Sequence, residues 1–220
     1  MTAHKGSQKQ NLIYSGGMCI ASIRKGGVLV YENKLPAGRV LVESSTPGTY
    51  TYTIPKTQNY YFIIVGAGGG SAWGGSGHYT NYNAAGGSGA CAAGVIKLAK
   101  GTVLTYVVGA LGANNAGSSV GDYPAKAGGL SSLSLSNTAF ATANGGGGAI
   151  AHIHTSPTRT PGAGGTYTMG TGVVVDSSIT KNGYAGINDT PGASVYGGFG
   201  KGNATGTVNG TNGYVLIKTA

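Results

Sequence analysis

Acidic side chains and histidines that could act together in catalysis are sparse in this 220-residue sequence. Hydrolysis by paired carboxylates needs two acids in one site. The sequence holds five acidic residues, and three of them lie beyond residue 46, each in a turn-like context: Asp122, Asp176 and Asp189. His78 has no neighbouring nucleophile or orienting acid, so it suggests no catalytic triad. We therefore expect no catalytic residues and no enzyme activity.

A histidine pair is the best candidate for metal chemistry. His152 and His154 flank one residue, which places both imidazoles on the same face of an extended segment. Such a pair could bind a metal, but no third ligand is evident nearby in the sequence. We expect surface or interface histidines here and no metal. Cys19 and Cys91 have no metal-ligand spacing either, and we expect both to be isolated core residues.

A glycine-rich turn after an apolar run suggests nucleotide binding at first sight. The run 60–65 is followed by Gly66-Ala67-Gly68, the first half of a dinucleotide-binding fingerprint. The pyrophosphate of such a ligand rests on a helix N-terminus, and residues 72–77 make a poor helix. Lys201 is followed by glycine where a phosphate-binding loop needs Ser or Thr for Mg²⁺. We expect no cofactor.

The charge of the chain favours anionic partners. The net charge is +9, from 14 Lys and Arg against 5 Asp and Glu. These positive charges are scattered, and no Arg-Gly-Gly triplet occurs, so we expect no nucleic-acid partner. No run approaches 18 apolar residues and the first ten residues contain no apolar signal segment, so we expect neither membrane insertion nor a signal peptide.

Glycine determines which folds are possible. The sequence has 44 glycines, one residue in five, against a usual share of about 7%. Each glycine inside a helix costs about 0.5–1 kcal/mol relative to alanine, so a helical domain is unfavourable. Collagen is excluded because glycine does not recur at every third position. The glycine tracts alternate with apolar runs, which favours ordered, hydrogen-bonded segments of the polyglycine-II type over flexible linkers.

Short apolar runs supply the strands that would position any site. A Lys-Gly-Gly sequence at 25–27 predicts a hairpin near the N-terminus, and Lys100-Gly101 predicts a second one. The expected strands are 12–14, 18–23, 28–31, 39–43, 50–54, 60–65, 95–98, 102–108, 131–135, 140–143, 173–175 and 214–217. The expected fold is all-β, with a small N-terminal β-hairpin unit over 1–45 and a glycine-rich, β-sandwich-like domain over 46–220 without a long helix.

The order of features from residue 47 onward is informative. A proline-bounded strand over 47–55 is followed by a strand that runs into glycines at 66–70. A Val-Val-Gly strand ends at Gly109, four glycines occupy 145–148, and Gly-Tyr-Val begins the closing strand at Gly213. This ordered set resembles the glycine-rich domain of bacteriophage tail-fibre and other virion proteins. Residues 20–32 also resemble a small hairpin module common in phage structural proteins.

The resemblance implies a function in the virion, assembled in the host cytoplasm. Tail-fibre tip adhesins of the T-even type pack polyglycine-II helices and carry variable loops that bind bacterial receptors. By this resemblance we expect a tail-fibre or tail-tip component whose partners are other virion proteins and a bacterial surface polysaccharide or outer-membrane receptor. The alternative is a purely structural component, such as a capsid decoration, head-fibre or fibre-attachment protein, docked through the N-terminal unit. Analogy with fibres suggests a homotrimer.

Specificity would then lie in three inserts between the glycine tracts. Aromatic rings stack on the apolar faces of sugars, and amides and acids bind sugar hydroxyls. The same aromatic residues could instead only cover the glycine layers, and the sequence leaves both interpretations open. The first insert contributes Trp73, His78, Tyr79, Tyr82 and Asn83; the second contributes His152, His154, Thr158 and Arg159; the third contributes Tyr184, Asn188, Asp189, Tyr196 and Phe199.

Overall fold

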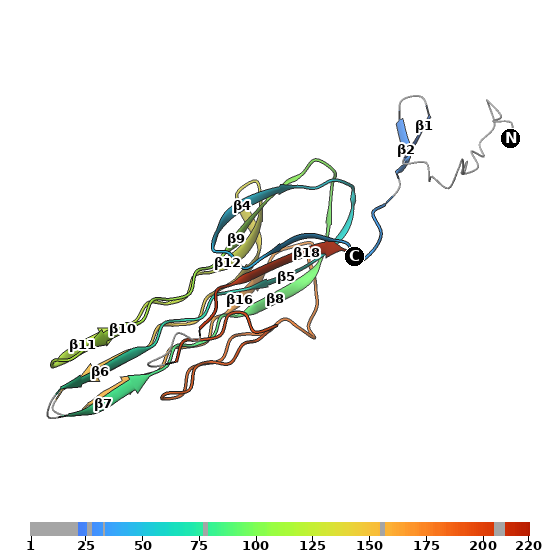
Figure 1. Cartoon of the computed structure of the whole chain (residues 1–220). Helices are drawn as coiled ribbons and strands as arrows, with labels where there is room; N and C mark the ends of the chain where they lie inside the picture. Colours follow the sequence, from blue (N-terminus) through green and yellow to red (C-terminus); the bar gives the residue numbers. More distant parts are fainter. Residues whose placement is uncertain (1–21, 26–27, 33, 77–78, 155–156, 205–209) are drawn as a thin grey trace. The chain divides into compact units, whose positions relative to one another are not determined.

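The structure is a computed structural model, and it describes residues 22–25, 28–32, 34–76, 79–154, 157–204 and 210–220 (Figure 1). None of the described residues is helical, so none could span a bilayer as a helix. Two compact units divide the chain, at residues 1–36 and 37–220. In the first unit, β1 (Ser22–Lys25) and β2 (Val28–Glu32) form the expected antiparallel hairpin. The strand expected at 12–14 and the start of that at 18–23 lie outside the described residues.

The sequence predicted that the second unit begins at residue 46, but in the structure it begins earlier. Residues 39–43 were expected in the N-terminal unit, but β3 (Val40–Ser44) pairs antiparallel with β18 (Tyr214–Thr219). Val42 is buried in the main core. The boundary therefore falls after Pro36. Local sequence could not show this, because the strand's partner lies at the other end of the chain.

Two five-stranded sheets form a β-sandwich. One sheet has the order β16-β13-β12-β9-β4, and the other has the order β17-β8-β5-β18-β3. The bounds of the remaining strands are β4 Gly48–Thr53, β5 Gln58–Val65, β8 Cys91–Leu98, β9 Val103–Val108, β12 Ser131–Leu135, β13 Thr138–Ala143, β16 Tyr167–Met169 and β17 Val174–Val175. The all-β, sandwich-like fold expected from the sequence is confirmed.

The hairpin expected around Lys100-Gly101 is wrong. Both strands exist, but β8 pairs with β5 and β9 pairs with β4 and β12, so the turn carries the chain from one sheet to the other. Gly101 has a φ of 82°, which suits a glycine in a tight turn. Two amphipathic strands joined by a short turn can either pair or face each other across a core. The local sequence does not distinguish these outcomes.

The core lies between the two sheets. Tyr60, Phe62 and Ile64 of β5 point into it, together with Leu104 and Leu133 from the opposite sheet. The Phe62 and Phe140 rings meet edge to face with centroids 5.8 Å apart. The alternate residues of β5, Ile63 and Val65, pack on the other face against residues from the C-terminal part of the chain. Both faces of β5 are therefore buried over its last residues, which explains the uninterrupted apolar run 60–65.

Six glycine-rich segments connect the sandwich to a second group of strands. Each segment joins one sandwich strand to one strand of that group, and each is six residues long: 66–71, 85–90, 109–114, 125–130, 144–149 and 161–166. They run alternately outward and back, as three excursions from the sandwich. At about 3.1 Å per residue, a polyglycine-II segment of this length spans about 19 Å and makes two turns.

Backbone hydrogen bonds in these segments recur at every third residue. The N–H groups of Gly66 and Gly69 both donate to segment 85–90, and those of Ala67 and Gly70 both donate to segment 125–130. Gly68 donates to a third neighbour, Thr211. Bonding in three directions with a period of three is the geometry of polyglycine II. The ordered glycine layer that the sequence predicted is confirmed.

The second group of strands lies at the ends of the glycine-rich segments that are far from the sandwich (Figure 1). We call this group the tip. It consists of two three-stranded sheets with the orders β10-β6-β7 and β11-β14-β15. The bounds are β6 Ala72–Ser76, β7 Tyr79–Ala84, β10 Asn115–Gly117, β11 Gly121–Pro124, β14 Ile150–Ile153 and β15 Thr158–Thr160. Small residues pack between the two sheets: Ala72, Ala84, Ala149 and Ala151. None of these six strands was expected from the sequence.

Candidate functional site

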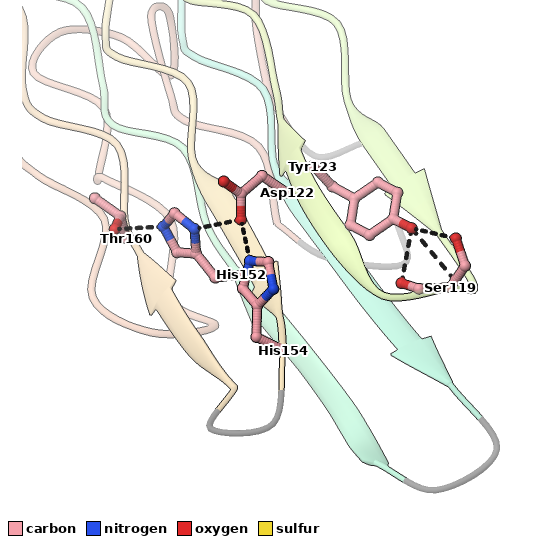
Figure 2. A network of polar contacts seen from close by, with 6 residues as sticks. All are labelled: Ser119, Asp122, Tyr123, His152, His154 and Thr160. Carbon is pink, nitrogen blue, oxygen red and sulfur yellow. Dashed lines mark hydrogen bonds and ion pairs between the residues drawn. The ribbon is translucent and has the colours of Figure 1, made fainter.

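The tip brings together the two histidines and an acid from a neighbouring strand. Strand β14 pairs antiparallel with β11, and this register sets His152 directly opposite Asp122. The Oδ1 atom of Asp122 lies 2.8 Å from His152 Nδ1 and 2.8 Å from His154 Nε2 (Figure 2). The turn position expected for Asp122 is therefore wrong, since it lies in a strand. It also supplies the third potential metal ligand that sequence proximity did not reveal.

Hydrogen bonds hold this cluster in place. The Nε2 atom of His152 is 3.2 Å from Oγ1 of Thr160, on the adjacent strand β15 (Figure 2). Tyr123 follows Asp122 in β11, so its side chain lies on the other face of that strand. Its hydroxyl donates to the carbonyl of Ser119 at 2.8 Å and accepts a hydrogen bond from the backbone N–H of Ser119. These contacts fix the loop before β11. Hydrogen bonds from His152 and His154 lower the pKa of the Asp122 carboxyl, which keeps it ionised.

The cluster offers a carboxylate, two imidazoles and a hydroxyl. Thr160, His152 and Asp122 follow the order hydroxyl, imidazole, carboxylate, as in a nucleophilic triad. Asp122, however, shares one oxygen between two imidazoles, which a triad does not require. Three ligand atoms within 4.8 Å of one another are the arrangement of a metal-ligand set.

A second cluster joins residues from all three inserts. The Arg159 guanidinium lies over the Tyr82 ring, 5.8 Å from its centroid. Its Nη1 atom donates to the backbone carbonyl of Asn83 and to Oδ1 of Asp189, both at 3.3 Å. Asp189 lies in a turn closed by backbone hydrogen bonds between Ile187 and Thr190, as the sequence predicted for this acid. Three separate stretches of sequence thus meet at one place.

Other candidates of the first insert lie on β6 and β7. Trp73 is 40% exposed and is paired with Asn83 across these strands, so both side chains lie on the same face of the sheet. Tyr79 begins β7. His78 lies outside the described residues. Tyr82 neighbours Asn83 in β7, so the Trp73 indole and the Tyr82–Arg159 contact lie on opposite faces of this sheet.

Residues of the third insert separate into two groups. Asn188 accepts a hydrogen bond from Ala85 through its carbonyl and has a φ of 50°, so it supports the turn beside β7. Tyr184 is exposed beside the glycine layer, with Lys181 Nζ 5.9 Å from its ring centroid.

Thr158, the remaining candidate of the second insert, is exposed in β15 and is paired with His152 of β14.

Tyr196 and Phe199 lie away from the tip. Both are half-buried, and both rings stack on Tyr214 of β18, with centroids 6.1 Å and 4.2 Å from it. They pack over Ile63 and Val65 on the outer face of β5. These two aromatic residues therefore cover the outer face of β5, and not the glycine layer that the alternative interpretation named.

Two residues important to the tip were missed in the sequence: Asp122 as a partner of the histidines, and Thr160. Asp122 lies 30 positions before His152, and only the pairing of β11 with β14 brings them together. The six glycine-rich segments have equal length, which implies that the strands beyond them begin at the same distance from the sandwich. This equal length is the signal that could have shown that Asp122 and His152 lie side by side.

Comparison with protein families gives a match over most of the chain. No curated protein matches the chain significantly. A family model described as a glycine-rich domain matches residues 44–219. This range covers the glycine layer, the tip and the sandwich apart from most of β3, and it exceeds half of the chain. The chain therefore belongs to the glycine-rich domain family.

Proposed function

We propose that this chain is a non-enzymatic structural protein of a bacteriophage particle, a tail-fibre or tail-tip component whose tip binds a glycan or receptor on a bacterial surface. The order of its sequence features, which resembles that of glycine-rich virion proteins, supports this proposal. The observation that carries it is the meeting of three inserts at the tip, where Arg159 contacts Tyr82, Asn83 and Asp189.

The glycine layer explains why specificity would be confined to the tip. A Cβ atom at Gly66 or Gly69 would overlap a backbone carbonyl, of Asn144 and Gly147 respectively. The segments therefore carry few side chains that could recognise anything. Beyond them, other tip residues carry side chains, because they lie in short, partly exposed strands. A layer held by backbone hydrogen bonds, with side-chain-bearing strands at its end, suits a protein that must hold a binding surface away from its anchor.

The chemistry of the tip suits a sugar ligand. The exposed indole of Trp73 offers a flat apolar face for a pyranose ring. On the other face of the β6–β7 sheet, beside Tyr82, Arg159 and Asp189 offer a donor and an acceptor for hydroxyl groups, and their mutual contact holds both side chains in position. The net charge of +9 adds a general attraction to anionic envelope polysaccharides.

Adsorption to bacteria tests this proposal. Labelled full-length protein would be titrated onto a panel of strains, and the variants Trp73→Ala and Arg159→Ala would be compared with Tyr167→Ala. Tyr167 is an exposed aromatic residue on β16, in the sandwich. We expect saturable adsorption that both tip variants lose and the control retains. Competition with polysaccharide and with outer-membrane protein extracts separates the two kinds of receptor. Absence of saturable adsorption to every strain, or equal adsorption by all variants, would refute receptor binding.

The alternative is a purely structural virion protein without receptor binding. The packing of Tyr196 and Phe199 over the sandwich favours it, since part of the aromatic content covers the fold. Immunogold labelling of intact particles separates the two proposals. Label at the tail tip supports the first, whereas label on the capsid supports a decoration or head-fibre role. Both proposals keep the expected trimer and the docking of the N-terminal unit onto another virion protein as predictions.

A further inference from the structure

We propose that Asp122, His152 and His154 together bind one divalent transition-metal ion at the tip. The two 2.8 Å separations join the carboxylate oxygen Oδ1 of Asp122 to one nitrogen of each imidazole. No described cluster elsewhere brings together three histidine, cysteine or acidic side chains in this way. This inference does not depend on the proposed receptor binding, because it rests on the ligand geometry alone.

The spacing of the three atoms suits an ion of the zinc size. Zinc lies about 2.0–2.2 Å from nitrogen and oxygen ligands, so two adjacent ligands of one ion are about 3–3.5 Å apart. The two oxygen–nitrogen distances are slightly shorter than this, and all three atoms lie within 4.8 Å of one another. Small side-chain rotations would open the cluster enough to admit the ion.

The donor set selects the class of metal. Imidazole nitrogen suits Zn²⁺, Cu²⁺, Ni²⁺, Co²⁺ and Fe²⁺, and two imidazoles with one carboxylate occur in both zinc and iron sites. Ca²⁺ and Mg²⁺ prefer oxygen ligands, and Asp122 is the one acid in this cluster. The site is therefore expected to discriminate against the alkaline-earth ions.

The surroundings of His152 suit a metal ligand. A ligating imidazole usually donates its second N–H to an oxygen, which fixes the ring and the position of its proton. When Nδ1 of His152 coordinates the ion, Nε2 carries the proton and faces Oγ1 of Thr160 at 3.2 Å. Strand pairing between β14 and β15 holds this threonine in place. The second partner that a metal-binding histidine needs is thus already present.

The ligands come from β11, from β14 and from the residue that follows β14, and they are accessible from solvent. The side chains of His152, His154 and Asp122 are 26%, 51% and 55% exposed. An ion can therefore enter without unfolding. Three protein ligands leave at least one coordination position for water or for a donor atom from another molecule. A bound ion would also cross-link β11 to β14 at the tip.

Calorimetric titration with Zn²⁺ tests the inference directly. Full-length protein without an affinity tag would be treated with a chelator, dialysed and titrated with ZnCl₂ and, separately, with MgCl₂. We expect one Zn²⁺ per chain and no measurable Mg²⁺ binding. Co²⁺ would serve as a second probe, because its visible absorption reports the ligands around the ion.

Variants locate the ion. Asp122→Asn and His154→Ala each remove one ligand and are expected to weaken Zn²⁺ binding by more than the roughly tenfold loss expected for Thr160→Val, which removes only the partner of His152. His4→Ala, which removes a histidine that is not part of this cluster, is the matched control and should bind as wild type. Circular dichroism checks that each variant keeps its β structure.

Two results would overturn the proposal. The first is the absence of stoichiometric Zn²⁺ binding by the wild-type chain, which would leave the cluster as a surface hydrogen-bond network. The second is binding that survives both ligand substitutions, or that is lost in the His4→Ala control, because the ion would then lie elsewhere. A ligand variant that failed to fold would not affect the wild-type measurement, and the remaining ligand variant would still locate the site.

Discussion

Replacing Gly69 by alanine should break the glycine layer at its centre. Gly69 donates a backbone hydrogen bond to Gly87 and accepts one from Asn203, both at 2.9 Å. A Cβ at this position would overlap the carbonyl oxygen of Gly147. That oxygen accepts a hydrogen bond from the backbone N–H of Gly87 at 3.0 Å. The added methyl group must therefore push two neighbouring segments apart and break at least this bond.

The expected loss of stability follows from three contributions. Overpacking in a rigid interior costs about 1–3 kcal/mol. The buried N–H of Gly87, left without its acceptor, costs about 1–3 kcal/mol more. Reduced freedom of the unfolded chain returns about 0.4–1 kcal/mol. The net destabilisation is about 3 kcal/mol, and for a chain of this size it lowers the Tm by about 6–12 °C.

Thermal unfolding followed by circular dichroism measures this effect. Gly172→Ala is the matched control, because Gly172 has a φ of 85° and a Cβ there would meet no atom within 4 Å. Its cost should come from backbone conformation alone, about 1 kcal/mol. The reasoning about close backbone contact would be refuted if Gly69→Ala lowered the Tm no further than Gly172→Ala does.

Two further predictions concern titratable side chains. Cys91 is fully buried, and burial raises the pKa of its thiol to about 12. At pH 8 we therefore expect peptide mass mapping to find no alkylation of Cys91 in the native protein and full alkylation in denaturant. Rapid alkylation of the native protein would contradict this prediction and show that β8 opens. Burial, and after it a hydrogen bond to Glu43, raises the pKa of the Tyr214 hydroxyl above its unfolded value near 10. The protonated hydroxyl therefore stabilises the folded state fully below about pH 10, and this contribution to the free energy of unfolding is lost as the pH rises further. Denaturant titrations at pH 8 and pH 11 should show a smaller loss for Tyr214→Phe than for wild type, and an equal loss would contradict this assignment.

Residues with strong local preferences allowed prediction of the sandwich. The β-branched and aromatic run 60–65 became β5, and 131–135 became β12 with the expected bounds. Sequence could not say which strands pair, because pairing depends on faces that meet across the core. The chain around Gly101 shows this limit, since two correctly expected strands belong to different sheets.

The tip strands were not predictable from local preference. Strand β6 has the sequence Ala-Trp-Gly-Gly-Ser, which shows no alternation and contains no β-branched residue. It is extended because the segments before β6 and after β7 are hydrogen-bonded into the glycine layer. The prediction of a turn at Asp122 was wrong because it, too, used local preference alone. Its neighbours Gly121 and Pro124 are typical turn residues, but pairing with β14 outweighs them.

The glycine layer also determines the geometry of a site that contains no glycine. Segments 125–130 and 144–149 connect the sandwich to β11 and β14, and both are six residues long, or about two turns of polyglycine II. Inserting one residue in either segment would advance its strand by about 3 Å and rotate the backbone beyond it by about a third of a turn. Asp122 and His152 would then no longer lie opposite each other. Retention of the carboxylate–imidazole contact after such an insertion would show that the tip sheets set their own register.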